Sequence, residues 1–228
     1  MASALVLFDI DGTLIRKAGP QHRRALETAA REVMQLEVSS DGIPTQGMLD
    51  HDILRDMLLA AGVKKTAIRA AMSRMVHAAE TCYMRECLPH LRHKVCPGAR
   101  NLLLKLHRKD VPTGLVTGNF TRIGWKKMEL AGLQRYLRFG AFAELAKDRA
   151  GLVKIAMKEA RAQGWLDRKT VVTLIGDHPN DILAARANGI RSVAVATGVV
   201  DAAELQTHKP DILVADLRTL HPETLLQA

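Results

Sequence analysis

The sequence has few aromatic residues and no long hydrophobic run. The first limits what can fill the core, and the second excludes a membrane-spanning helix. Phe, Trp and Tyr make up only 4% of the 228 residues, so Leu, Val, Ile, Ala and Met must fill the core. No apolar stretch approaches the roughly 20 residues that a membrane-spanning helix needs. Near the N-terminus, no basic region precedes an apolar run with a cleavage site, as it would in a secretory signal. We therefore expect a cytoplasmic protein without membrane contact.

Cysteine is scarce as well, and its few copies are irregularly spaced. The chain has Cys82, Cys87 and Cys96, an odd number without a Cys-x-x-Cys pair. A disulfide framework is typical of much shorter secreted chains, and this spacing does not match that of a zinc site. We predict buried or incidental thiols.

Positive charge, in contrast, is in excess, because 33 Lys and Arg residues face 24 Asp and Glu residues and the net charge is +9. Such an excess indicates nucleic acid or an anionic small molecule as a partner. The basic residues form scattered clusters, such as Lys126-Lys127, without a basic arm, a repeat or an aromatic ladder on which bases could stack. We predict solvated helix faces that help to attract a phosphorylated substrate and no nucleic-acid partner, and the choice between monomer and dimer stays open.

An apolar run from Ala4 to Phe8 ends abruptly at two carboxylates, Asp9 and Asp11. Such a run is typical of a parallel strand buried on both faces, and ligands collect at the carboxyl ends of such strands. Two carboxylates this close repel each other unless a cation or a shared proton intervenes. One can attack as a nucleophile while the other carries a proton. The alternative is that Asp-Gly forms only a solvated turn here.

The rest of the chain alternates between helix and strand patterns from Pro97 onward, which is typical of a three-layer α/β fold with a parallel sheet. Residues 16–91 instead contain three helical patterns without a strand between them. We therefore predict a Rossmann-like core of residues 1–15 and 92–228 with 16–91 inserted as a helical cap. The predicted helices are 16–36, 50–61, 64–88, 98–109, 121–131, 150–163 and 181–188, and the later strands are 112–116, 139–143, 171–175, 192–196 and 211–214.

Two more polar motifs follow predicted strands. Residues 117–119 (Thr-Gly-Asn) offer a hydroxyl and free N–H groups that can hold phosphate oxygens, although such a triplet is also an ordinary turn. Residues 176–181 place Asp177 and Asp181 four residues apart at another strand end. Their hard oxygens suit Mg²⁺, whereas the bland alternative is that Asp181 merely caps the next helix.

Taken together, Asp9-Ile10-Asp11-Gly12-Thr13 and the Gly-Asp-x-x-x-Asp motif at 176–181 resemble the haloacid dehalogenase superfamily, specifically its Asp-based phosphatases. The helical insertion resembles the cap of the phosphoglycolate phosphatase-like branch. The resemblance implies a Mg²⁺-dependent phosphatase that hydrolyses a small phosphorylated metabolite, with its substrate chosen by the cap.

The resemblance also assigns roles to the carboxylates. It implies that Asp9 is the nucleophile, which forms an aspartyl phosphate, and that Asp11 is the general acid and base. Mg²⁺ is expected to bridge Asp9, the backbone carbonyl of Asp11 and Asp177, with Asp181 as a ligand or a support.

Phosphate binding is assigned in the same way to Thr117, Gly118 and Asn119. The family places one basic residue near the start of a helix between these motifs, where it steadies the nucleophile and the phosphate. Lys147 and Arg149 are the candidates here, and Lys147 is preferred by residue type.

Two further predictions concern the rim of the site and the cap loop. His178 occupies a variable position and is interpreted as a rim residue. The cap loop 45–50 is similar to a Gly-Arg-Thr-Asp stretch of relatives, with Met48 and Leu49 in place of the polar pair. If this loop reaches the site, it favours an apolar or weakly polar leaving group; alternatively, both side chains only pack within the bundle.

Three other functions are open on the sequence. A true haloacid dehalogenase expels a halide that needs no proton, so Asp11 argues against it. A phosphosugar mutase would use all the same core residues. A non-enzymatic binding protein would tolerate loss of one of the four motif carboxylates, and all four are present.

Overall fold

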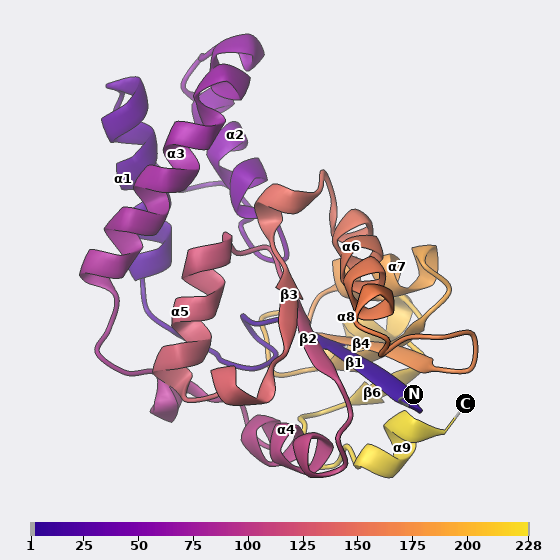
Figure 1. Cartoon of the computed structure of the whole chain (residues 1–228). Coiled ribbons are helices and arrows are strands. Elements are labelled where there is room, and N and C mark those ends of the chain that lie inside the picture. The colour runs from indigo at the N-terminus through magenta and orange to yellow at the C-terminus, as the bar shows by residue number, and fades with distance from the viewer. Residues whose placement is uncertain (1–2, 228) are drawn as a thin grey trace.

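A parallel sheet forms the centre of the molecule, which the computed structural model describes for residues 3–227. Within that range the sheet has six strands in the order β3-β2-β1-β4-β5-β6, and each neighbouring pair is parallel. The strands are β1 (Ala4–Phe8), β2 (Thr113–Val116), β3 (Phe139–Ala141), β4 (Val171–Gly176), β5 (Arg191–Val195) and β6 (Ile212–Val214). The predicted α/β fold class is therefore confirmed (Figure 1).

Nine α-helices accompany these strands in the described residues. They are α1 (Gln21–Met34), α2 (Asp50–Ala60), α3 (Lys65–Glu86), α4 (Ala99–Arg108), α5 (Thr121–Ala131), α6 (Arg149–Ala162), α7 (Pro179–Ala187), α8 (Ala202–Thr207) and α9 (Pro222–Leu226). Three short 3₁₀ helices also occur in the described residues: η1 (Arg92–Lys94), η2 (Gln134–Tyr136) and η3 (Ala143–Leu145).

Strand β1 owes its central place to its unbroken apolar sequence. All five of its residues are buried. Leu5 and Leu7 belong to the apolar cluster that includes α6 and α7, whereas Val6 and Phe8 belong to the cluster on the other face, which includes α4. Full burial of each large side chain stabilises the fold by roughly 1.5–3 kcal/mol, so the position of the residues that follow β1 is firmly set.

The strand register brings three chain segments to one edge of the sheet. Phe8 of β1 pairs with Leu115 of β2 on one side and with Ile175 of β4 on the other. Because the strands are parallel, the segments that leave their carboxyl ends all emerge side by side. The site residues expected after each strand are therefore neighbours in space.

Some element boundaries differ from the prediction. Helix α1 begins at Gln21 and not at residue 16, because Gly19 has a φ of +97° and interrupts a helical path before it. The short helices α8 and α9 were not predicted, since each is too brief to show a helical repeat in its sequence.

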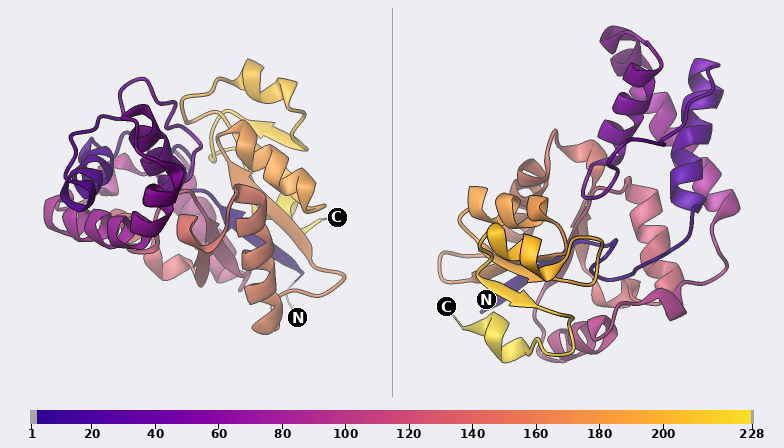
Figure 2. Two further views of the ribbon diagram at one scale, coloured as in Figure 1. Left: turned by 90° about the horizontal axis from the view of Figure 1, so that it is seen from above. Right: turned by 180° about the vertical axis from the view of Figure 1, so that it is seen from behind.

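Helices α1, α2 and α3 stand together beyond the carboxyl edge of the sheet, as all three views show (Figures 1 and 2). The chain enters and leaves this bundle at one place, where Ile15 forms an antiparallel bridge with Val95 and the N–H of Arg16 donates to the carbonyl of Lys94 at 2.9 Å. The predicted boundaries at 15/16 and 91/92 remain predictions, and this crossing lies close to both.

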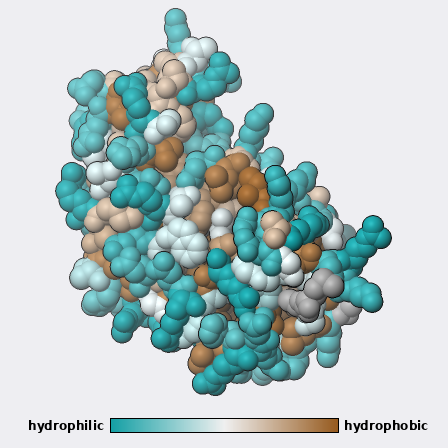
Figure 3. All heavy atoms as spheres, in the orientation of Figure 1, coloured by the Kyte–Doolittle hydropathy of each residue, from teal (hydrophilic) through white to brown (hydrophobic). Residues whose placement is uncertain are grey.

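Hydrophilic side chains cover most of the surface in the view of Figure 3, over both the bundle and the core. Apolar side chains show between them as separate areas. Among the described residues, the structure contains no helix that combines the length and the apolar character needed to cross a membrane.

Candidate active site

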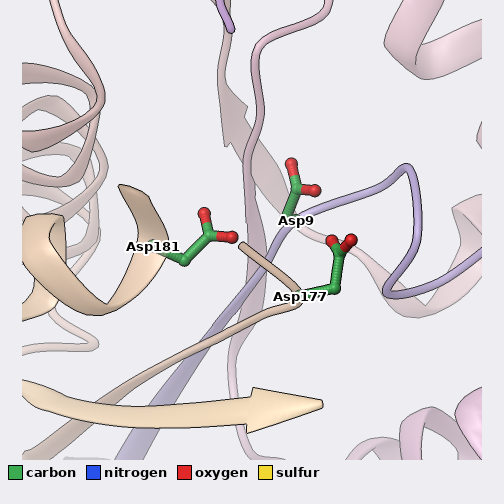
Figure 4. Close-up of side chains that lie close together, drawn as sticks. All are labelled: Asp9, Asp177 and Asp181. Atoms are coloured by element: carbon green, nitrogen blue, oxygen red, sulfur yellow. The ribbon is translucent and has the colours of Figure 1, made fainter. Parts of the chain in front are cut away.

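Three carboxylates from separate segments meet at the carboxyl edge of the sheet. Asp9 directly follows β1, Asp177 directly follows β4, and Asp181 lies in the first turn of α7. One ligand oxygen of each lies within 4.8 Å of the others, and all three residues are buried. Figure 4 shows their carboxyl groups turned toward a common space. The predicted convergence of the two Asp motifs is thus observed in the structure.

Local geometry holds the Asp177 carboxylate in this cluster. The Thr13 hydroxyl donates to Asp177 Oδ1 at 3.1 Å. Gly12 and Gly198 approach the same carboxylate so closely that a Cβ atom on either would lie within 2.1 Å of Asp177 Oδ2. Gly12 also has a φ of +93°, which glycine adopts at little cost.

Asp181 both caps a helix and lies in the carboxylate cluster, two positions that the sequence presented as alternatives. Its Oδ2 accepts a hydrogen bond from the backbone N–H of His178 at 3.2 Å and so caps the N-terminus of α7. Its Oδ1 lies 3.1 Å from Arg149 Nη1 inside the carboxylate cluster. The capping interpretation is correct, and it also orients the side chain toward the site.

The cluster carries more negative charge than the surrounding protein balances. Burial and the neighbouring carboxylates Asp9 and Asp181 raise the pKa of Asp177 to about 8. Burial also raises the pKa of Asp181 to about 7, although Arg149 opposes this. A bound cation would remove the repulsion that causes these shifts, so the three carboxylates fit a hard divalent metal ion.

Arg149 is the basic residue that the fold brings to this cluster. Its Nη1 lies 3.0 Å from Asp9 Oδ1 and donates to the carbonyl of Val116 at 3.3 Å. Burial alone would lower the pKa of Arg149, but Asp181 and Asp9 outweigh it, and the pKa is raised. Its buried Nε has no partner among the described residues and remains available to a bound anion.

Lys147, which residue type favoured, is not brought to the site. Its side chain is exposed, and it is absent from the described residues that line the cleft. The reason is the start of α6: Asp148 caps this helix by accepting from the N–H of Gly151 at 2.7 Å. Arg149 then begins the helix facing inward, whereas Lys147 precedes the cap on the surface.

Asp11 lies apart from the carboxylate cluster. Its Oδ2 accepts hydrogen bonds from Asn119 Nδ2 at 2.8 Å and from Lys127 Nζ at 2.6 Å. Desolvation by the protein would raise the pKa of Asp11, but the pKa lies below its usual value, chiefly because of the charge of the nearby Lys127. The Asp11 side chain is 45% exposed, toward the cleft.

Lys127 is a site residue that sequence reasoning missed, because Lys126-Lys127 was interpreted as a solvated pair. It is 1% exposed. The signal was its place on α5: Ile123, Gly124 and Ala131 also lie on the buried face, at helical spacing from Lys127. A lysine on that face needs buried partners, and the Asp11 carboxylate supplies one.

The predicted phosphate-binding segment, residues 117–119, lies between the carboxylate cluster and the Lys127–Asp11 pair. Thr117 is fully buried, and its Oγ1 accepts from Asn119 Nδ2 at 2.8 Å. The Gly118 carbonyl accepts from the N–H of Asp50 at 2.8 Å. A Cβ atom on Gly118 would lie 2.2 Å from the Met48 carbonyl, so glycine permits the close approach of the cap loop.

The cap loop therefore reaches the site. The Gly47 carbonyl accepts from Asn180 Nδ2 at 2.9 Å and faces Arg149 Nη2 at 3.5 Å. Met48 lines the cleft, whereas Leu49 is buried in the apolar core and does not. His178 lies on the cleft wall, and its Nδ1 accepts from the N–H of Asn180, which fits the predicted rim position.

These residues enclose a cleft of about 740 Å³ between the core and the helical bundle. The core contributes Asp9, Asp11, Asp177, Arg149 and Lys127 to its lining. The bundle and its connecting loops contribute Met48, Tyr83 and His22. A cleft of this size takes a small molecule.

Comparison with known proteins agrees with this geometry. Residues 4–189 match the model of the haloacid dehalogenase-like hydrolases. The chain belongs to this family. The predicted recognition of the superfamily, and of a hydrolase within it, is confirmed.

Its curated relatives include a phosphoglycolate phosphatase from Pseudomonas fluorescens, which is 27% identical over 97% of this chain and 79% of its own length. A phosphoglycolate phosphatase from Vibrio cholerae is 24% identical, with 98% of both chains covered. Among solved structures, a β-phosphoglucomutase from Clostridium difficile aligns with a TM-score of 0.70 at 16% identity, covering 98% of this chain and 95% of that one.

Proposed function

We propose that the protein is a Mg²⁺-dependent phosphatase that hydrolyses a small phosphate monoester through an aspartyl phosphate on Asp9. The observation that carries this proposal is the convergence of Asp9, Asp177, Asp181 and Arg149 in one buried cluster, with Asp11 lining the same cleft. The names of the matched relatives, which are phosphatases, support the same reaction.

In the first half of the reaction, Asp9 attacks phosphorus in line, a bond from its carboxylate oxygen to phosphorus forms, and the bond to the ester oxygen breaks. Asp11 delivers a proton to the departing oxygen. Because the pKa of Asp11 lies below its usual value, the free enzyme holds it ionised. The proton must therefore reach Asp11 from the substrate or from water of the cleft.

In the second half, Asp11 accepts a proton from a water molecule that attacks phosphorus, and the bond between phosphorus and the Asp9 oxygen breaks. Phosphate leaves and Asp9 is restored, and the proton on Asp11 passes to phosphate or to water of the cleft, which returns Asp11 to its ionised state. The resting charge of Asp11 already suits this general-base step.

Arg149 and the 117–119 segment balance charge in both halves. Arg149 Nε is buried without a partner among the described residues, so it can donate to a phosphoryl oxygen. Asp9 and Asp177, with the Asp11 carbonyl, would hold Mg²⁺ and Asp181 would support them. When bound, the ion would supply Lewis-acid polarisation of the phosphoryl group and neutralise its charge.

The test is a panel of phosphate esters with Mg²⁺, in which released phosphate is measured and phosphoglycolate is included. We expect activity that exhaustive chelation abolishes and that added Mg²⁺ restores. Full activity after chelation would contradict the metal requirement. The panel also includes β-glucose 1-phosphate with detection of glucose 6-phosphate, because a phosphosugar mutase would rely on the same core residues.

A further inference from the structure

The Lys127 ammonium occupies a closed cage at the edge of the site. Its Nζ lies 2.6 Å from Asp11 Oδ2, 2.6 Å from Asn119 Oδ1 and 3.1 Å from His22 Nδ1. An ammonium group has three N–H donors and no acceptor. All three donors are therefore engaged by protein atoms, and the Lys127 residue itself is 1% exposed.

This geometry separates the role of Lys127 from that of Arg149. A cation that binds substrate phosphate needs a free N–H group, and the buried Nε of Arg149 has no partner among the described residues. Lys127 instead donates its N–H groups to neighbouring side chains. Burying an ammonium is costly unless it is fully paired, so a lysine kept here has a function in holding those neighbours in place.

The third acceptor comes from the helical bundle and not from the core. Because Lys127 can only donate, His22 Nδ1 must accept, which leaves the proton on Nε2. Nε2 lies 2.9 Å from Asp50 Oδ2 at the start of α2. The same Asp50 oxygen accepts from the backbone N–H of Phe120 at 2.8 Å.

Asp50 is thus hydrogen-bonded to the core through its side chain. It is also bonded through its backbone, because its own N–H donates to the Gly118 carbonyl at 2.8 Å. Asp50 and Lys127 are both buried. A continuous hydrogen-bonded path runs from the core backbone at Phe120 through Asp50, His22 and Lys127 to the Asp11 carboxylate. The path is complete only while the bundle is docked on the core.

We propose that Lys127 is a positioning residue that fixes the Asp11 carboxylate for the breakdown of the aspartyl phosphate, and that His22 and Asp50 of the bundle complete its cage on docking. This inference rests on the proposed function, because it assigns Asp11 the general-base step. It adds that this step requires a docked bundle, whereas Asp9 and Arg149 pair with each other within the core.

The main experiment compares Lys127→Met with Lys126→Met on p-nitrophenyl phosphate and Mg²⁺. The leaving phenolate needs little protonation, so kcat/KM reports the attack of Asp9 and kcat reports breakdown of the phosphoenzyme. We expect Lys127→Met to lower kcat about 10- to 100-fold, a part of the usual general-base contribution, with KM falling in parallel. The kcat/KM value should stay within about 3-fold, and a burst of about one p-nitrophenolate per site should appear.

Lys126→Met is the matched control, because it makes the same change one residue away. Lys126 is on the outer side of α5 and pairs with Glu129 at 2.9 Å. We expect its kinetic constants to stay at wild-type values.

The cap side of the cage is tested by His22→Leu and His22→Asn. Leucine removes the acceptor, whereas the Asn side-chain oxygen can occupy the place of Nδ1. We expect a several-fold loss of kcat with constant kcat/KM for His22→Leu and partial recovery for His22→Asn. Equal effects of the two changes would argue against a hydrogen-bonding role for His22.

Two kinetic outcomes overturn the proposal. Wild-type behaviour of a folded Lys127→Met variant would show that Asp11 needs no such support. An equal fall in kcat and kcat/KM without a burst would show that Lys127 serves formation of the phosphoenzyme or the fold, and not breakdown of the phosphoenzyme.

If the wild-type enzyme with Mg²⁺ hydrolyses no ester, the proposed function fails, and crystal structures of wild type and Lys127→Met decide the positioning role separately. Rotation of the Asp11 carboxylate away from Asn119 in the variant would support it. An unmoved carboxylate would overturn it.

Discussion

The two halves of the cleft differ in how far the protein balances the negative charge of their carboxylates. On one side, Asp9, Asp177 and Asp181 share Arg149 as their single cation among the described residues, and the pKa values of Asp177 and Asp181 are raised to about 8 and about 7. On the other side, the Asp11 carboxylate has Lys127 and Asn119 as close partners.

The contrast extends to Asp11 itself, whose pKa lies below its usual value. The first half of the cleft is built to receive a cation from outside, whereas the second is completed by the protein, and partly by its helical bundle. On the proposals made above, the first half requires a metal ion and the second requires a docked bundle.

The largest expected effect comes from Asp9→Asn in the metal-dependent half. The amide is nearly isosteric with the carboxylate but cannot attack phosphorus, so kcat should fall by at least about 10³-fold while the fold is kept. Phosphate release and circular dichroism measure the two properties. Wild-type rates in a folded variant, with mass spectrometry excluding deamidation, would remove Asp9 from this role.

Arg149 and Lys147 form a matched pair that sharpens the same comparison. Arg149→Met removes the only cation that the described residues bring to the carboxylate cluster, and we expect kcat/KM to fall about 10²- to 10³-fold. Lys147→Met alters an exposed side chain, so its effect should stay within about 2-fold. Similar losses for both variants would contradict the assignment of Arg149 as the basic residue of the site.

The raised pKa of Asp177 predicts how the stability of the metal-free protein depends on pH. The pKa is 3.8 in a model compound and about 8 in the fold, so the folded state binds more protons between these values. The free energy of unfolding should therefore decrease as pH rises toward 8. Each kcal/mol lost corresponds to about 2–4 °C in Tm for a chain of this size.

Thermal unfolding in chelator between pH 5.5 and 8.5 measures this dependence, with Asp177→Asn as the control. As pH rises, the Tm of the wild type should fall relative to the Tm of Asp177→Asn. Mg²⁺ should restore the wild type most at high pH, where the carboxylates are ionised. A difference in Tm that does not change with pH would contradict an excess of negative charge in the carboxylate cluster.

The smallest expected effect concerns substrate choice. Met48 lines the cleft and offers no charge to a leaving group, so Met48→Arg should favour anionic esters such as phosphoglycolate over neutral ones by several-fold. Values of kcat/KM across the ester panel measure the change. An unchanged rank order in a folded variant would show that this loop does not contact the leaving group.

The features that sequence reasoning predicted are those determined locally. A buried strand followed by carboxylates is visible in a short window, and parallel strands bring such ends together, so Asp9, Asp177 and Asp181 could be placed before the structure. The choice between Lys147 and Arg149 depended on the exact start of α6, which Asp148 caps. Helix boundaries read from a sequence are uncertain by more than one residue.

Lys127 was missed for a different reason. Its partner Asp11 lies 116 positions away in the sequence, and a lysine is ordinarily exposed. Only the helical spacing of its buried neighbours indicated an inward position, and the acceptor on His22 comes from a bundle whose docking no local pattern describes.

The most direct test of the central claim is chemical trapping of the phosphoenzyme. Enzyme turning over p-nitrophenyl phosphate with Mg²⁺ is quenched in acid and treated with borohydride, which reduces an aspartyl phosphate to homoserine, and peptides are then sequenced by mass spectrometry. The account predicts homoserine at position 9, only when substrate and Mg²⁺ are both present, and more of it in Lys127→Met than in the wild type. Homoserine at another position, or none in an enzyme caught during turnover, would contradict it.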